Sequence, residues 1–544
     1  MQTKTKMFKT YAIGASRLWA LGLLALAAGS SFARASTRLV TSPADSGAGS
    51  LREVIIAAQS GDQVVFDPSL AGQTITLTSG QLAITKSLDI EGPGADELAV
   101  SGNHASRVFS VSGGVTVTIA GLTITDGRVV GEDGGGILNV GSTLILARDV
   151  LSHKQALGAP GVPGVPSRSA FGGAIMNASG ATLTVTDSLF TANRAVGGEG
   201  GAGRNQGFGG GLENAASTAT IRRSTFIGNK AIGGDGGVLA PAVPAIGRGA
   251  GGAIHHTNGI LAVDQSTFIA NQARGGANNL GGSSGLGFVG VAVDGGLSSD
   301  GTAAVATVTN STFDHNEALG GTGNTGGSSG GYVGTGQFGG IGTGEGATFT
   351  ARNIRLTHNR AIGGDGNTAG AGNTAETFVG RGVGGGFASF GGATATISNS
   401  MIADNQALGG QGGGSNGGDA LGGGLANTSG ATLTVSGCTI TDNEAVGGDG
   451  GAGGNGFGAG LFNDGPSTNP SDPPTTLTVL GSTVTGNEAN GGEGDDPGTD
   501  GLGVGGGLYI VPDGIVCIDV DTSIFENHAS GSDDDVSGFF TICP

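Results

Sequence analysis

Flat aromatic side chains and charged side chains are both scarce in this sequence. Its 544 residues include one Trp and three Tyr, and Lys, Arg, Asp and Glu together make up 12%. Beyond residue 35 only Tyr332 and Tyr509 remain of these aromatic residues. So little charge excludes a charged disordered chain, while 117 glycines are too many for an ordinary globular domain. A repeat architecture is the remaining class.

Long hydrophobic runs are also missing, since no segment approaches the roughly 18 apolar residues that a membrane helix needs. The short run LWALGLLALAAG follows several basic residues and precedes the small residues Ala33 and Ala35. This pattern predicts a signal peptide over 1–35 and an exported, soluble mature chain. Its removal takes away five cations and no acid, which changes the formal charge from -19 to -24. Nucleic acid is therefore excluded as a partner.

Cysteine is limited to three residues, all in the last quarter of the chain. In an exported protein, Cys517 and Cys543 have the opportunity to form a disulfide near the C-terminal end. Cys438 stands where other repeats carry serines such as Ser188 and Ser224, so we expect a small buried residue there.

Glycine-rich repeats make up most of the sequence. The stretch 172–203, GGAIMNASGATLTVTDSLFTANRAVGGEGGAG, returns until the chain ends. Aligned copies place an asparagine every 36 to 46 residues, and Lys154 occupies the same position one copy earlier. This alignment gives about ten units from Gly134 onward. The asparagines are Asn193, Asn229, Asn271, Asn316, Asn359, Asn405, Asn443, Asn487 and Asn527.

Each unit contains three segments typical of short strands, which read GGAIMN, ATLTVT and SLFTAN in the first complete copy. Apolar and polar residues alternate in the second segment, as in a half-buried strand. A recurrent corner follows it, occupied mostly by residue types that tolerate left-handed backbone, with Arg223 and Gln265 as exceptions. The corner residues are Asp187, Arg223, Gln265, Asn310, Asn353, Asn399, Gly437, Gly481 and Asp521.

One such unit has too little apolar surface for a core of its own, but stacked copies share a continuous core. Identical strands stacked in the same sense form parallel ladders, and parallel crossovers are right-handed. The sequence therefore predicts an all-β fold, a single-stranded right-handed parallel β-helix. In it the asparagines form an internal hydrogen-bonded ladder. A second, partial column is interrupted by His256 and Val511; it contains Asn139, Asn177, Asn214, Asn427 and Asn463.

The glycine runs recur at one corner of each unit and should emerge as a row of lateral loops. They are either disordered in solvent or packed as a layer, and the sequence leaves both interpretations open. Four regions are predicted: the signal peptide 1–35, a cap helix with the first coils over 36–133, the glycine-rich repeats over 134–530, and an end segment over 531–544. In the second region Leu51, Val54 and Ile55 share one helical face, and Ser50 is the expected N-cap.

The N-terminal GSLREVI segment and the VVFDPSLAGQTITLT series after it resemble bacterial extracellular proteins with a CSLREA-type motif, although Gly49 replaces the motif's cysteine. The units resemble the GGAI and FxxN repeats of polymorphic outer-membrane proteins and adhesins. GGAI occurs at Gly172–Ile175 and Gly251–Ile254, and FxxN begins at Phe190, Phe226, Phe268 and Phe313. The resemblance implies a pectin-lyase-like β-helix at the cell surface.

No residue is predicted to be catalytic, cofactor-binding or metal-binding. The nearest approach to the carboxylate and basic clusters of polysaccharide enzymes is Arg222 and Arg223 beside Asp187 and Asp264, which we interpret as a solvent face. His153, His315 and His358 precede the asparagine column at a replaceable turn position, and the adjacent His255 and His256 should point to opposite faces. Calcium is the alternative for two acidic sites, Gly491–Asp496 and Asp533–Asp535.

The leading interpretation is therefore an exported, non-enzymatic repeat protein whose acidic shaft serves adhesion or matrix structure at the cell surface. Extracellular glycans or surface proteins are its expected partners, and self-association is open. The alternative is a polysaccharide lyase or glycosidase that acts in a groove of the β-helix, favoured by the fold resemblance alone.

Overall fold

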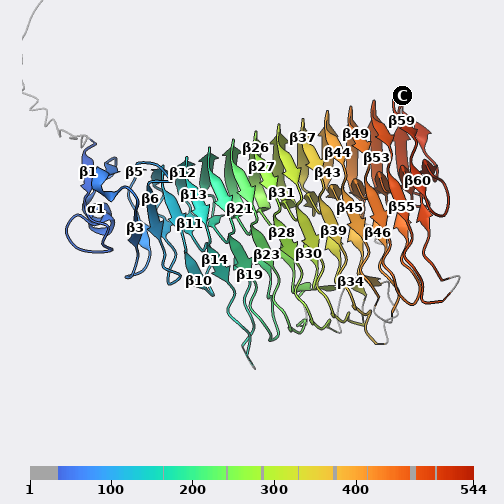
Figure 1. The fold of residues 1–544 in the computed structure, drawn as a ribbon, viewed down its shortest axis with the longest axis horizontal. Helices are drawn as coiled ribbons and strands as arrows, with labels where there is room; N and C mark the ends of the chain where they lie inside the picture. Colours follow the sequence, from blue (N-terminus) through green and yellow to red (C-terminus); the bar gives the residue numbers. More distant parts are fainter. Residues whose placement is uncertain are drawn as a thin grey trace, which may run out of the picture. The chain divides into compact units, whose positions relative to one another are not determined.

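The computed structural model describes residues 35–543 except 163–164, 241–242, 283–286, 329, 372–376, 413–414, 466–472 and 497–498. The predicted signal peptide lies outside these residues apart from Ala35. The described chain belongs to one compact unit, in which successive coils stack along one axis as a right-handed parallel β-helix (Figure 1). Among the described residues, no helix has the length and apolarity needed to cross a lipid bilayer.

One coil illustrates how the repeat folds. Its three predicted strands are β16 (Ile175–Ala178), β17 (Thr182–Thr186) and β18 (Leu189–Thr191). A fourth strand, β19 (Arg194–Val196), follows directly after Asn193 and was not predicted. The first two strands of each coil join a 25-stranded sheet, the third strands a 13-stranded sheet and the fourth strands an 11-stranded sheet. Each strand pairs in parallel with its equivalent in the next coil.

Side chains that alternate along each strand build the core. In β17 Leu183 and Val185 are buried and the threonines between them are not, as the alternation predicts. Phenylalanines at the FxxN positions stack along the axis: the Phe190 and Phe226 rings lie 4.3 Å apart, and the Phe268 and Phe313 rings also lie 4.3 Å apart. Like side chains thus meet in vertical files, and the core is continuous through the coils.

The predicted asparagine ladder is confirmed. From Asn193 to Asn487, each side-chain amide donates to the side-chain oxygen of the next asparagine, at 2.8–3.0 Å. Each amide also donates to a backbone carbonyl of the preceding coil, as Asn193 does to Leu151 O at 3.0 Å. The ladder ends at Asp535, whose carboxylate accepts from the Asn527 amide at 3.0 Å.

The second column also forms hydrogen bonds along the stack. Asn139 donates to Asn177 at 2.8 Å, and the Asn214 amide lies 3.0 Å from His256 Nδ1, so the histidine takes part in the column. The interruption predicted at Val511 was misplaced by one residue, because Ile510 pairs with Asn463. At the predicted corner, Arg223 and Gln265 adopt left-handed backbone with φ of 45° and 50°, as their asparagine equivalents do.

The lateral glycine runs are packed as a layer wherever the structure describes them. Short strands such as β20 (Gly207–Phe208) form a nine-stranded sheet, and β24 (Ala245–Ile246), β29 (Gly287–Val289), β34 (Gly331–Val333) and β40 (Thr377–Val379) form a further sheet of four. A second core that includes Phe208, Phe338 and Phe462 lies beneath the layer. Glycine is required here because the backbones of neighbouring coils nearly touch.

The two ends of the stack are built differently. The helix α1 (Leu51–Ala57) buries Leu51 and Ile55 at the first coil, and Ser50 Oγ accepts a hydrogen bond from Glu53 N at 3.3 Å, as predicted. At the other end a disulfide joins Cys517 to Cys543, whereas Cys438 is buried and free. Burial raises the pKa of the Cys438 thiol, which fits the small buried residue expected there.

Lys154 begins the ladder column and is fully buried. Its Nζ donates to Ile124 O, the carbonyl that an asparagine amide would contact at this position. Burial holds the pKa of Lys154 well below its usual value, against the opposing effect of Asp126 and Asp149. The ladder therefore starts on an amine whose charged form is destabilised.

Replacing Lys154 with Asn should stabilise the protein by about 1 kcal/mol at pH 7, through a neutral hydrogen bond to Ile124 O. Since folding lowers the pKa of Lys154, the unfolded chain binds more protons, and wild-type stability rises with pH toward the ordinary lysine value of 10.5. The advantage of K154N should thus be smaller at pH 10 than at pH 7 in thermal unfolding. If the stability difference between K154N and the wild type grew with pH, the lowered pKa of Lys154 would be contradicted.

Candidate functional site

A large groove lies at the corner between the second and third strands of several coils. Its volume is about 780 Å³, and its charged lining residues are Glu91, Asp96, Arg148, Asp149, Asp187 and Arg223. Arg148 pairs with Glu91 and Arg223 pairs with Asp187, each at 2.8 Å. The groove thus contains four carboxyl groups and two arginines, and each arginine is paired with one of the carboxylates.

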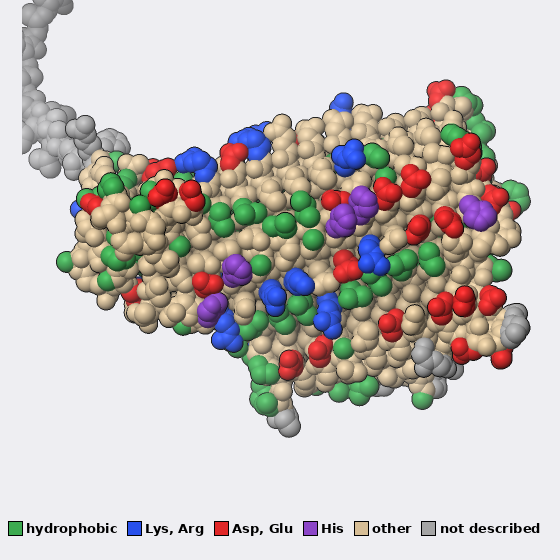
Figure 2. Space-filling view, in the orientation of Figure 1, with side chains coloured by type: hydrophobic (Ala, Val, Ile, Leu, Met, Phe, Trp, Pro, Cys, Tyr) green, Lys and Arg blue, Asp and Glu red, His purple; other side chains and the backbone are tan. Residues whose placement is uncertain are grey.

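The sequence-predicted cluster is only partly brought together. Arg223 and Asp187 line the groove, whereas Arg222 pairs separately with Asp264 at 3.3 Å. All four side chains are partly exposed, in agreement with a solvent face. On the face drawn in Figure 2, charged side chains of both signs are spread along the stack.

Asp149 is a groove residue that the sequence analysis missed. It occupies the column that holds Ser188 and Ser224 in later coils, and its carboxylate accepts hydrogen bonds from Leu122 N and Ala147 N. Burial raises the pKa of Asp149 to about 8, despite these hydrogen bonds, so the side chain is protonated at neutral pH. The sequence did contain a signal for this residue, because Asp149 is an aspartate at a position where the later repeats have serine.

A second group of charges lies under the glycine layer. His255 Nδ1 is 2.9 Å from a Glu213 carboxylate oxygen, its Nε2 is 3.6 Å from Asp300, and Arg248 is also 3.6 Å from Asp300. Burial alone would lower the pKa of His255, but the two carboxylates outweigh it and raise the pKa to about 10. The imidazole is therefore a cation held between two carboxylates at neutral pH.

This buried group is closed to large ligands. Glu213, His255 and Asp300 are 2%, 5% and 4% exposed, and the Phe208 ring of β20 stacks on His255 at 4.7 Å. The neighbouring His256 points into the core, where burial lowers its pKa to about 4. The prediction that the two histidines face opposite sides is confirmed.

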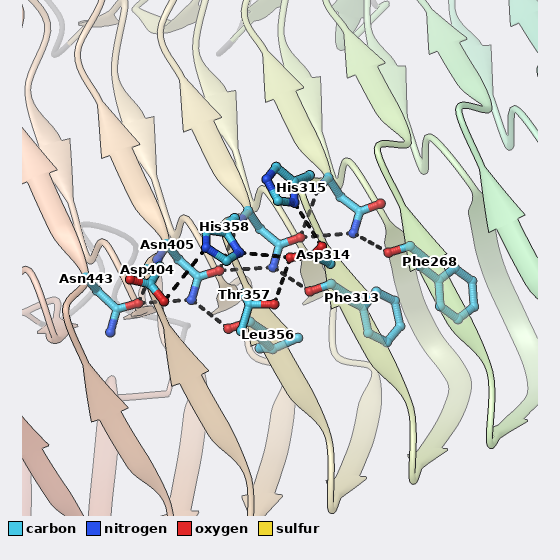
Figure 3. A network of polar contacts seen from close by, with 12 residues as sticks. Phe268, Phe313, Asp314, His315, Leu356, Thr357, His358, Asp404, Asn405 and Asn443 are labelled. Carbon is cyan, nitrogen blue, oxygen red and sulfur yellow. Dashed lines mark hydrogen bonds and ion pairs between the residues drawn. The ribbon is translucent and has the colours of Figure 1, made fainter.

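A third group is exposed at the ends of β32 (Thr312–Asp314) and β38 (Arg355–Thr357). His315 Nδ1 lies 2.9 Å from one oxygen of Asp314, and His358 Nδ1 lies 2.9 Å from the other (Figure 3). Both histidines have left-handed backbone, with φ of 55° and 53°, as expected for turn residues. Burial opposes ionisation of Asp314, but hydrogen bonds from His358, His315 and Thr357 hold its pKa below the usual value.

This third group differs from the other candidate metal sites. Within the described residues, it is the one set of three or more His, Cys, Asp or Glu whose ligand atoms all lie within 4.8 Å of one another. The acidic segments Gly491–Asp496 and Asp533–Asp535 form no such set there, and Gly498 lies outside the described residues. Asp534 and Asp535 instead accept hydrogen bonds from the last coil, at Ala529 N and Asn527.

Comparisons with known proteins add little to this geometry. No family model and no curated protein matches the sequence. Among solved structures, a mannuronic acid specific family 6 polysaccharide lyase from human gut microbiota is 9% identical, with a TM-score of 0.35, over 88% of this chain and 87% of that one. The surface adhesin PfbA of Streptococcus pneumoniae is 11% identical, with a TM-score of 0.33, over 79% and 86%.

The A-module of the mannuronan C-5 epimerase AlgE6 of Azotobacter vinelandii is 12% identical, with a TM-score of 0.32, over 93% of this chain and 99% of that one. Likenesses this remote carry no argument about activity. The fold class, a right-handed parallel β-helix, follows from the stacked parallel sheets themselves.

Proposed function

We propose that this chain is an exported, non-enzymatic shaft with an adhesive or structural role at the cell surface or in the extracellular matrix. The asparagine ladder carries the proposal, because it links every coil from Asn193 to Asp535 by buried hydrogen bonds. Buried polar ladders of this kind fix register and rigidity along a stack. Export rests on the basic and apolar pattern of the N-terminal sequence.

The charged groups support this role. The buried group around His255 joins the glycine layer to the main sheet, since Arg248 comes from the layer and Glu213 from β21 (Leu212–Arg222). Such an arrangement fixes one packing of the layer and offers no surface to a polymer. The acidic exterior favours neutral glycans or basic surface proteins as partners over polyanions.

A second candidate function, cleavage of a glycan, is favoured by one observation in the large groove. Asp149 holds a proton at neutral pH, whereas hydrogen bonding to Arg223 keeps the pKa of Asp187 below its usual value. Two carboxyl groups with pKa values pushed apart are the arrangement that general acid and base catalysis uses.

Incubation of the purified protein with pectin, alginate and neutral glycans distinguishes the two functions. We expect retention on a glycan or cell-surface fraction without release of reducing or unsaturated ends. Asp149→Ser provides a matched variant, because serine stands in this column in later coils. Glycan cleavage by the wild type that is lost in D149S would contradict the non-enzymatic role and support the enzymatic one.

A further inference from the structure

We propose that Asp314, His315 and His358 form a binding site for a divalent transition metal such as Zn²⁺. The site is a property beyond the proposed shaft role, since neither adhesion nor rigidity requires it. Two imidazoles and one carboxylate form the donor set that Zn²⁺ and its neighbours prefer, whereas Ca²⁺ and Mg²⁺ prefer oxygen ligands alone.

The distances suit a single ion. Both Nδ1 atoms face the same carboxylate at 2.9 Å, and the two rings stack with centroids 4.6 Å apart. Zinc lies about 2.0–2.1 Å from each ligand atom, so the donors around one tetrahedral ion are about 3.4 Å apart. The ligand atoms of the three side chains already lie within 4.8 Å of one another, and rotation about the side-chain bonds brings them to this separation.

The backbone holds the two histidines in place. Each directly precedes a ladder asparagine in the chain, and these two asparagines are joined by the hydrogen bond that Asn316 donates to Asn359 at 2.9 Å. Thr357 Oγ1 donates to Asp314 at 2.8 Å and helps to hold the carboxylate that both Nδ1 atoms contact. On the next coil, a carboxylate oxygen of Asp404 lies 3.9 Å from His358 Nε2, the ring nitrogen that does not contact Asp314.

The site is open on its outer side. The His315 and His358 side chains are 60% and 50% exposed, and they border a groove of about 220 Å³. With three protein ligands, a tetrahedral ion keeps one position for water or for a donor from a partner. An ion at this place would therefore be able to bind an outside ligand.

Zinc titration of the full chain, purified without a polyhistidine tag, tests the proposal by calorimetry. We expect one Zn²⁺ per chain, with no competition from equal Ca²⁺. His315→Asn and His358→Asn keep a residue that tolerates left-handed backbone, and each should weaken Zn²⁺ binding by about 100-fold or more. Asp314→Asn, which keeps the side-chain shape, should also weaken it.

His153→Asn is the matched control, because His153 has the same turn position and a φ of 57° in an earlier coil. Its Zn²⁺ affinity should equal that of the wild type, and Co²⁺ should give a visible absorption band in the wild type and H153N that H315N lacks. Wild-type affinity in H315N, H358N and D314N would overturn the proposal. Equal losses in H153N, or equal competition by Ca²⁺, would overturn it as well.

Discussion

Replacing Asn316 with Ala should lower the free energy of unfolding by about 4 kcal/mol. The Asn316 amide donates to Asn359 Oδ1 at 2.9 Å and to Phe268 O at 3.0 Å, and its oxygen accepts from Asn271 at 2.9 Å. Alanine removes these three hydrogen bonds and the one that Asn271 N donates to the Asn316 oxygen at 3.1 Å, and each buried group left unpaired costs roughly 1–3 kcal/mol. Urea unfolding followed by circular dichroism measures the change.

Asn399→Gly is the control for this prediction. Asn399 is exposed, has a φ of 49° at the corner column, and is replaced by Gly437 and Gly481 in later coils. Its substitution should shift the unfolding midpoint little. If N316A were as stable as N399G, the ladder would not hold the coils together.

The fold was predictable because the coils repeat one pattern of columns. Asn193, Phe190 and their equivalents recur at fixed places, and a residue type that recurs in every copy meets itself once the copies stack. The fourth strand, β19, escaped prediction because its three residues give too short a pattern to separate from a turn.

The order of the glycine layer was not predictable, because glycine carries no side chain whose periodicity would indicate a strand. The packed layer depends on backbone contacts between coils, which a sequence does not display. The partners of His255 were hidden for a related reason, because Glu213 and Asp300 belong to the coils on either side. Asp300 is paired with Thr257, two residues along the strand from His255.

The prediction for the exposed histidines, which was based on their position in the repeat, was correct but incomplete. His315 and His358 were interpreted as replaceable turn residues, and the structure confirms the turns. Both histidines contact Asp314 because two adjacent coils carry histidine at the turn position and the first of them also carries an aspartate one residue earlier. The other repeats do not combine these residues. Residues that depart from the repeat thus have individual roles: Asp149 has a raised pKa, and Asp535 accepts the last hydrogen bond of the ladder.

Replacing Gly448 with Ala should disrupt the glycine layer and destabilise it by about 3 kcal/mol, the upper part of the usual range for overpacking. A Cβ at Gly448 would lie 2.7 Å from the carbonyl carbon of Gly410 and closer still to its oxygen. The obstacle is backbone on a neighbouring coil, which has no side chain to rotate away. Gly448 N also donates to Gly418 O at 2.9 Å, so this glycine segment is held by a hydrogen bond as well as by close packing.

Gly451→Ala is the matched control in the same loop, because the nearest heavy atom to its Cβ, Ser415 O, is 3.7 Å away. Hydrogen exchange at the backbone amides of residues 448 and 454 should be faster in G448A than in the wild type, with little change in G451A. If the two variants exchanged alike, the layer would not be closely packed. Because the second core lies beneath this layer, the loss in G448A should spread to Phe457 and Phe462, whereas the asparagine ladder on the other side of the coil should keep its protection.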